Sequence, residues 1–159
     1  PGWGVAIACT ALVGHSIGEN NPNKSQEYTL YSTIIASIFM GILACFFFFI
    51  PKILVSFFIN KQEIDVIKIG AICLQVAAFE QIPIAIVTVL GSYFKGIGNP
   101  KTPFYVSFFT NWFLRLPIAF YLISILRLPV YIYWFITTFQ WLVESVILYY
   151  LYRKNIIKR

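Results

Sequence analysis

Charged residues are scarce in this sequence. They make up 11% of its 159 residues, whereas a soluble domain carries about a quarter. The hydrophobic set accounts for 59% of the chain. A soluble body of this length would bury only about two-thirds of its unfolded surface, so many apolar side chains must face something other than water. The composition therefore favours a chain whose partner is the lipid bilayer.

Residues that carry chemistry in soluble enzymes are also few. Cys9, Cys45 and Cys73 stand alone in apolar stretches, without the paired spacing of a zinc or redox motif. His15 is the only histidine, and no second metal ligand lies near it. No serine, cysteine or lysine has an evident partner base for covalent catalysis. We therefore expect no metal, no cofactor and no enzymatic activity.

Five apolar segments, separated by short polar connections, predict an all-α, polytopic transmembrane helix bundle. A spanning helix needs about 20 residues. The first segment, residues 1–13, would cover only about 20 Å as a helix and predicts a truncated span. The four full spans are predicted at residues 29–50, 66–94, 104–125 and 130–152.

The polar connections predict the topology. Residues 14–28 and 95–103 are rich in Asn, Gly and Pro and predict turns, so neighbouring helices should run antiparallel. Seven basic residues then fall on one side and four on the other. The larger group is Lys24, Lys95, Lys101, Arg153, Lys154, Lys158 and Arg159, and the smaller is Lys52, Lys61, Lys68 and Arg127. This bias predicts a multi-pass protein with a cytoplasmic C-terminus. Because the basic residues form no continuous stripe, the net charge of +6 does not indicate nucleic-acid binding.

Three charged residues fall well inside the predicted spans, where charge is costly and usually functional or paired. Arg115 and Glu144 lie at similar predicted depths, about 16 Å and 12 Å from the cytoplasmic side, and predict a structural ion pair. Glu80 lies deeper, at about 21 Å. Pro83 follows it and frees a backbone carbonyl about one turn earlier. A kink, a carbonyl and a carboxylate together predict a site for a coupling cation or proton; the alternative is a neutral Glu80 that hydrogen-bonds a neighbouring helix.

Four sequence blocks occur in a definite order along the chain. They are Ala11 to Gly18 with Asn21 to Lys24, Phe79 to Pro83, Phe94 to Pro103, and Asn111 and Trp112 with Arg115 to Pro117. Each block is degenerate alone, but their order resembles that of the multidrug and toxic compound extrusion (MATE) transporters.

The resemblance implies a twelve-helix antiporter of two six-helix lobes in the plasma or inner membrane. Such a protein exports cationic or amphipathic small molecules in exchange for sodium ions or protons. Residues 1–159 would form part of the C-terminal lobe, and the missing N-terminal lobe would be its partner. His15 stands where the family more often has glutamine, and Glu80 lies about one turn before the acidic position of one branch, which is Ile84 here. The coupling ion therefore stays open.

Three other functions are compatible with an apolar helical chain. A lipid-linked saccharide flippase belongs to the same wider superfamily. A membrane-embedded enzyme could use Glu80 and Arg115, but it would need a cluster of polar residues at one membrane face, which the sequence does not contain. A non-catalytic assembly subunit would have to be complete, whereas Pro1 at the start and Met40 as the only methionine predict a fragment.

Overall fold

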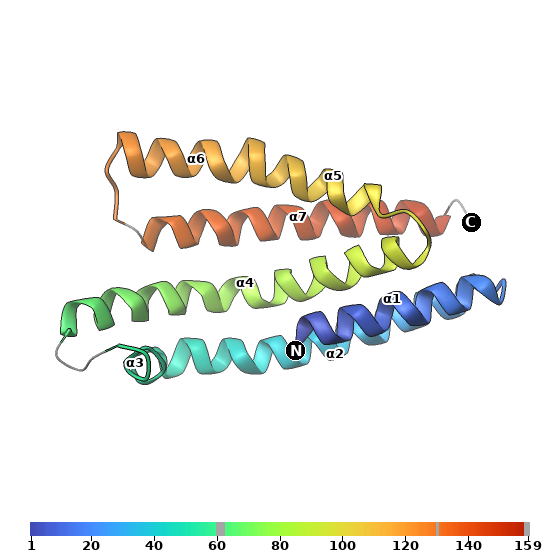
Figure 1. Ribbon diagram of the computed structural model, residues 1–159, viewed down its shortest axis with the longest axis horizontal. Helices are drawn as coiled ribbons and strands as arrows, with labels where there is room; N and C mark the ends of the chain where they lie inside the picture. Colours follow the sequence, from blue (N-terminus) through green and yellow to red (C-terminus); the bar gives the residue numbers. More distant parts are fainter. Residues whose placement is uncertain (60–62, 130, 158–159) are drawn as a thin grey trace.

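The computed structural model describes residues 1–59, 63–129 and 131–157, which form helices and short connections (Figure 1). The predicted positions Lys61, Val130, Lys158 and Arg159 lie outside these ranges. The elements are α1 (Gly2–Gly18), α2 (Pro22–Phe49), α3 (Pro51–Ser56), α4 (Ile64–Gly96), α5 (Lys101–Phe109), η1 (Thr110–Arg115), α6 (Leu116–Phe120), η2 (Tyr121–Ile125) and α7 (Tyr131–Ile157). The predicted all-α class is confirmed.

Three helices in the described ranges are long and apolar enough to cross a membrane. They are α2, α4 and the continuous helix Lys101–Ile125, while α1 is a shorter apolar helix. At 27 residues, α7 is also long enough, but its apolar content falls short because polar side chains interrupt it. The crossing predicted for residues 130–152 therefore stays a prediction.

The connection between α1 and α2 is much shorter than the predicted turn at residues 14–28. The helix continues to Gly18, and α2 already begins at Pro22. Asn20 reverses the chain with a φ of 54°. Asn21 then accepts a hydrogen bond from the Lys24 backbone N–H at 3.3 Å, and Pro22 occupies the first helical position, where its missing donor costs nothing. Polar residues at 14–28 are thus largely helical, and the predicted boundaries were wrong.

The helix from Lys101 to Ile125 contains two π-helical stretches, η1 and η2, on either side of α6. Pro117 lies at the start of α6 and has no N–H to donate to the preceding turn. A π turn widens the helix locally and often occurs at functional sites. Arg115 is the last residue of η1, so this irregular segment determines where its side chain points.

The long helices lie side by side, with α4 in the middle of the bundle (Figure 1). It packs against α1 and α2 on one side and against α7 on the other. The α1–α2 and α4–α5 connections and the end of α7 lie at one end of the bundle. We call this the basic end, because it carries Lys24, Lys95, Lys101, Arg153 and Lys154.

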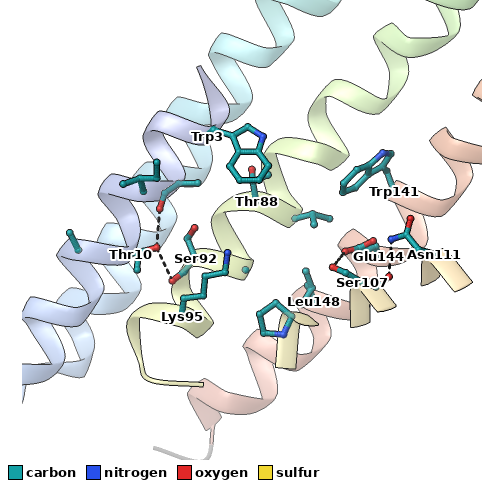
Figure 2. A pocket seen from close by; sticks show the side chains of 16 residues that line it. Trp3, Thr10, Thr88, Ser92, Lys95, Ser107, Asn111, Trp141, Glu144 and Leu148 are labelled. Atoms are coloured by element: carbon teal, nitrogen blue, oxygen red, sulfur yellow. Dashed lines mark hydrogen bonds between the residues drawn. The ribbon is translucent and has the colours of Figure 1, made fainter. Parts of the chain in front are cut away.

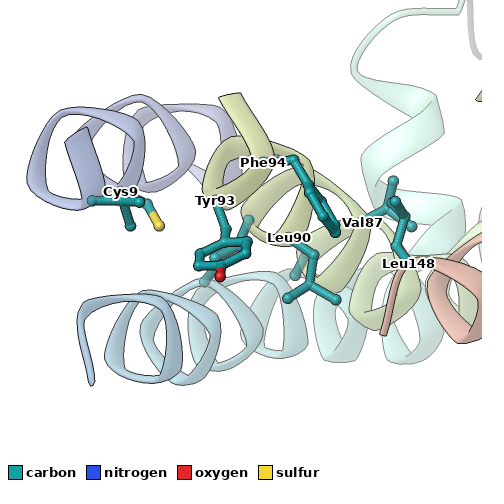
Figure 3. Close-up of a cluster of buried hydrophobic side chains, with 10 residues drawn as sticks. Cys9, Val87, Leu90, Tyr93, Phe94 and Leu148 are labelled. Carbon is teal, nitrogen blue, oxygen red and sulfur yellow. The ribbon is translucent and has the colours of Figure 1, made fainter. Parts of the chain in front are cut away.

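The apolar core holds α1, α2, α4 and α7 together (Figure 3). A methyl group on Gly96 would lie 2.8 Å from the Val13 side chain and 2.9 Å from the Thr10 carbonyl oxygen, so α1 and α4 approach closely only because this residue is glycine. The ring of Tyr93 packs edge-on against that of Tyr152 on α7, with centroids 4.7 Å apart. Close packing therefore fixes α4 against both α1 and α7.

Candidate functional site

A cavity of about 590 Å³ lies between α1, α4, α5 and α7 (Figure 2). Its size is typical of pockets that hold small organic molecules. Trp3 of α1 and Trp141 of α7 contribute two indole rings to an otherwise largely aliphatic lining. Among the polar side chains that line it are Lys95, Ser107 and Glu144. The sequence alone did not predict this cavity.

Glu144 is the acidic residue of the cavity wall, and it is only 1% exposed. Ser107 donates a hydrogen bond to its Oε1 at 2.5 Å. Thr110 and Gln140 donate to its Oε2 at 2.9 Å and 2.5 Å. Gln140 lies one turn before Glu144 on α7, and Ser107 and Thr110 lie one turn apart on the facing helix, so each pair shares a helix face. We call these four residues the Glu144 cluster.

Arg115 does not pair with Glu144, which corrects the predicted ion pair. In the described part of the chain, no basic side chain forms an ion pair with Glu144. Arg115 instead donates hydrogen bonds to Asn111 Oδ1 at 3.3 Å and to the Tyr133 hydroxyl, and its guanidinium lies 5.1 Å from the centre of the Tyr133 ring. Eleven residues separate Tyr133 from Glu144, which is about 16 Å along a helix. The two charges therefore lie at different levels of the bundle.

Glu80 lies on α4 and is 7% exposed. The Thr137 side chain on α7 and the charge of Arg115 act on its carboxyl group, and the Thr137 hydroxyl also donates to the Trp134 backbone carbonyl at 2.8 Å. Within the described ranges, its Oε2 atom is buried and has no hydrogen-bond partner. Pro83 is buried three residues later, and α4 runs through it without a break. Glu80, Thr137, Arg115 and Tyr133 thus form a second polar group, the Glu80 cluster, which is distinct from the Glu144 cluster.

One residue connects the two clusters. The Asn111 side chain accepts from Arg115 and donates to the Ser107 backbone carbonyl at 2.8 Å. Asn111 also lines the cavity. Sequence reasoning had noticed Asn111 only as part of a family block, and it had missed Ser107, Thr110 and Gln140. The available signal was the spacing of Gln140 and Glu144, which places an amide and a carboxylate on one face of an apolar helix.

Most of this chain is similar to known proteins. The MatE family model matches residues 1–121, which include Glu80 and Arg115 but not Glu144. The chain is 26% identical over 128 residues to the probable multidrug resistance protein NorM of Thermotoga maritima, covering 80% of this chain and 27% of that protein. The NorM protein of Mannheimia succiniciproducens is 27% identical over 118 residues, covering 74% and 25%. The chain therefore spans about a quarter of the length of the curated relatives it matches.

Proposed function

Because the chain belongs to the MatE family, we propose that it forms part of an antiporter that exports amphipathic or cationic compounds across the cell membrane in exchange for a cation. The relatives are named as probable multidrug resistance proteins, which supports export of foreign compounds. In transporters built from repeats, alternating access moves one repeat against the other around a site between them. The chain would therefore act together with the rest of a longer protein, its N-terminal lobe included.

The unpartnered Oε2 of Glu80 is the observation that supports cation coupling. A buried polar atom without a partner costs about 1–3 kcal/mol, so some group should occupy this position during the transport cycle. Intramembrane acids commonly mark ion and proton pathways. A bound proton would remove the charge that is otherwise buried here, and its release would restore the attraction to Arg115.

We propose a proton as the coupling ion, because the surroundings of Glu80 favour it over sodium. A hard metal cation binds several oxygen ligands, whereas the oxygens identified at Glu80 are its own carboxylate, the Thr137 hydroxyl and the backbone carbonyl that Pro83 frees about one turn earlier. The nearby guanidinium of Arg115 would also repel a second full positive charge. A proton needs only one carboxylate oxygen and no coordination shell.

Substitution of Glu80 by glutamine in the full-length protein tests this proposal. The change keeps the shape and removes the titration, so we expect efflux driven by a pH gradient in proteoliposomes to fall at least about tenfold, as it does when a required proton carrier is lost. Glu63→Gln, at an exposed carboxylate just before α4, should transport at the parental rate. Parental transport by Glu80→Gln, with an unchanged dependence on pH, would exclude Glu80 as the coupling site. Efflux driven by sodium at equal pH would exclude the proton.

The membrane orientation is part of the same proposal. The basic end carries more Lys and Arg than the opposite end, where Lys52, Lys68 and Arg127 lie, and basic residues are retained in the cytoplasm. We therefore expect a reporter that works only in the cytoplasm to be active when fused after the C-terminus. A reporter that works only outside the cytoplasm should be silent there, and the opposite pattern would reverse the orientation.

A further inference from the structure

We propose that Glu144 and Lys95 are opposed specificity-determining residues of the cavity. Glu144 attracts an aromatic cation and Lys95 repels it, so that the balance of the two charges decides which charged compounds bind. This inference rests on the proposed export function, but it concerns recognition of the exported compound and not the coupling ion. The two side chains come from α7 and α4, on opposite sides of the cavity (Figure 2).

Glu144 supplies an attractive charge that is not neutralised within the described part of the chain. Its three hydrogen bonds come from two hydroxyls and an amide, which carry no formal charge. A carboxylate has about four lone-pair sites, so one site on Oε1 remains after these three bonds. The donors fix the side chain in place and thereby hold a negative charge at the cavity wall, where the low dielectric strengthens its attraction for a cation.

The two indole rings suit an aromatic cation better than a small inorganic one. Trp3 lies on α1 and Trp141 on α7, so the rings come from different walls of the cavity. Tryptophan is the most favourable side chain for a cation over its ring face, and both rings also offer apolar surface to the aromatic groups of a ligand. Na⁺ would use neither property, whereas a cation surrounded by aromatic rings would use both.

Lys95 places the opposite charge at the same cavity. It lies in the last turn of α4, is exposed, and forms no ion pair with the described acidic residues. Its ammonium group would repel a cationic ligand and attract an anionic one. Substituting Glu144 and Lys95 should therefore shift binding in opposite directions, which a purely structural role of either residue does not predict.

Equilibrium binding to the purified full-length protein, at one pH and without any ion gradient, tests the inference. The probes are tetraphenylphosphonium and tetraphenylborate, which share a shape and carry opposite charges. Glu144→Gln should weaken tetraphenylphosphonium binding about tenfold, corresponding to about 1.4 kcal/mol, and should not weaken tetraphenylborate binding. Lys95→Gln should strengthen tetraphenylphosphonium binding severalfold and weaken tetraphenylborate binding.

The affinity ratio of the two probes is the deciding readout. If neither substitution changes this ratio, the inference is wrong. Should Glu144→Gln fail to fold, Lys95→Gln at an exposed position and Trp141→Leu still decide the matter, since loss of the indole should weaken tetraphenylphosphonium binding. The failure of this inference is distinguishable from failure of the proposed function, because binding without a gradient does not depend on coupling at Glu80. Suppose that Glu80→Gln loses pH-driven efflux while Glu144→Gln leaves the affinity ratio of the two probes unchanged. The proposal that Glu80 couples transport to protons would then stand, and the inference about the cavity would be rejected.

Discussion

Glu80 and Glu144 are both buried carboxylates in apolar helices, yet their surroundings differ. Glu144 accepts three hydrogen bonds from neutral donors. Glu80 interacts with Thr137 and with the charge of Arg115, and its Oε2 has no hydrogen-bond partner within the described ranges. Hydrogen-bond donors on both oxygens hold Glu144 in a single arrangement, as a recognition group requires. Glu80 has an oxygen without a hydrogen-bond partner, so binding or release of a proton there breaks fewer hydrogen bonds in the surrounding structure.

The largest expected effect is a difference in protein stability between substitution of Glu144 and substitution of Glu80 by leucine. Glu144→Leu would remove the acceptor of Ser107, Thr110 and Gln140, which leaves Thr110 only the Ser107 carbonyl at 3.2 Å and Gln140 only the Thr110 hydroxyl at 3.4 Å. Each buried group left unpaired costs about 1–3 kcal/mol. Glu80→Leu removes the interactions with Thr137 and with the charge of Arg115, which keeps Asn111 and Tyr133 as hydrogen-bond partners. We therefore expect a smaller loss of stability than for Glu144→Leu, of about 1 kcal/mol. Thermal unfolding of the full-length protein in detergent measures both.

The outcome that would break the comparison is equal destabilisation by the two leucine variants. It would mean that the Glu80 carboxylate is held as firmly as that of Glu144, for example by the alternative hydrogen bond to a neighbouring helix. Glu63→Leu serves as the matched control, because the same substitution at an exposed carboxylate outside the spans should change stability by no more than about 0.5 kcal/mol.

The same comparison explains what sequence reasoning could achieve. Glu80, Arg115 and Glu144 were found, because a charge stands out in an apolar segment. The helices were also found, since the apolar runs are long. The partners of the charged residues were not predictable from the sequence. Depth counted from predicted helix ends ignores rotation about the helix axis and the π-helical stretch that ends at Arg115. Arg115 therefore seemed level with Glu144, although it contacts Tyr133.

Hydroxyl and amide side chains were missed for a different reason. In apolar helices such residues commonly bond to the backbone of their own helix, as Thr29 does to the Ser25 carbonyl at 2.7 Å and Thr33 to the Thr29 carbonyl at 2.8 Å. Nothing in the sequence distinguishes these from Ser107 and Thr110, which reach a carboxylate on another helix. Thr110 does so while it also contacts the Ser107 carbonyl of its own helix at 3.2 Å. That distinction arises only from the packing of α7 against the helix Lys101–Ile125.

The smallest expected effect concerns the link between the two clusters. Tyr133→Phe removes the hydroxyl that accepts from Arg115 but keeps the ring beneath the guanidinium. Because Arg115 retains Asn111, we expect a loss of only about 1 kcal/mol in stability, but a measurable change in the pH dependence of efflux, since the arginine can then move relative to Glu80. Tyr150→Phe, at an exposed ring on α7, is the control and should change neither quantity.

Binding of tetraphenylphosphonium to Tyr133→Phe then shows whether the clusters act independently. The Glu144 cluster shares no hydrogen bond with Tyr133, so the affinity should stay within about twofold of the parent, a difference of less than 0.5 kcal/mol. Among the described residues, the hydrogen-bonded link between the clusters is Asn111, which joins Arg115 to the Ser107 backbone. A larger shift in affinity would mean that a rearrangement at Arg115 reaches Glu144 through Asn111. Recognition and coupling would then be physically connected inside this one bundle, and Asn111→Leu should abolish the connection.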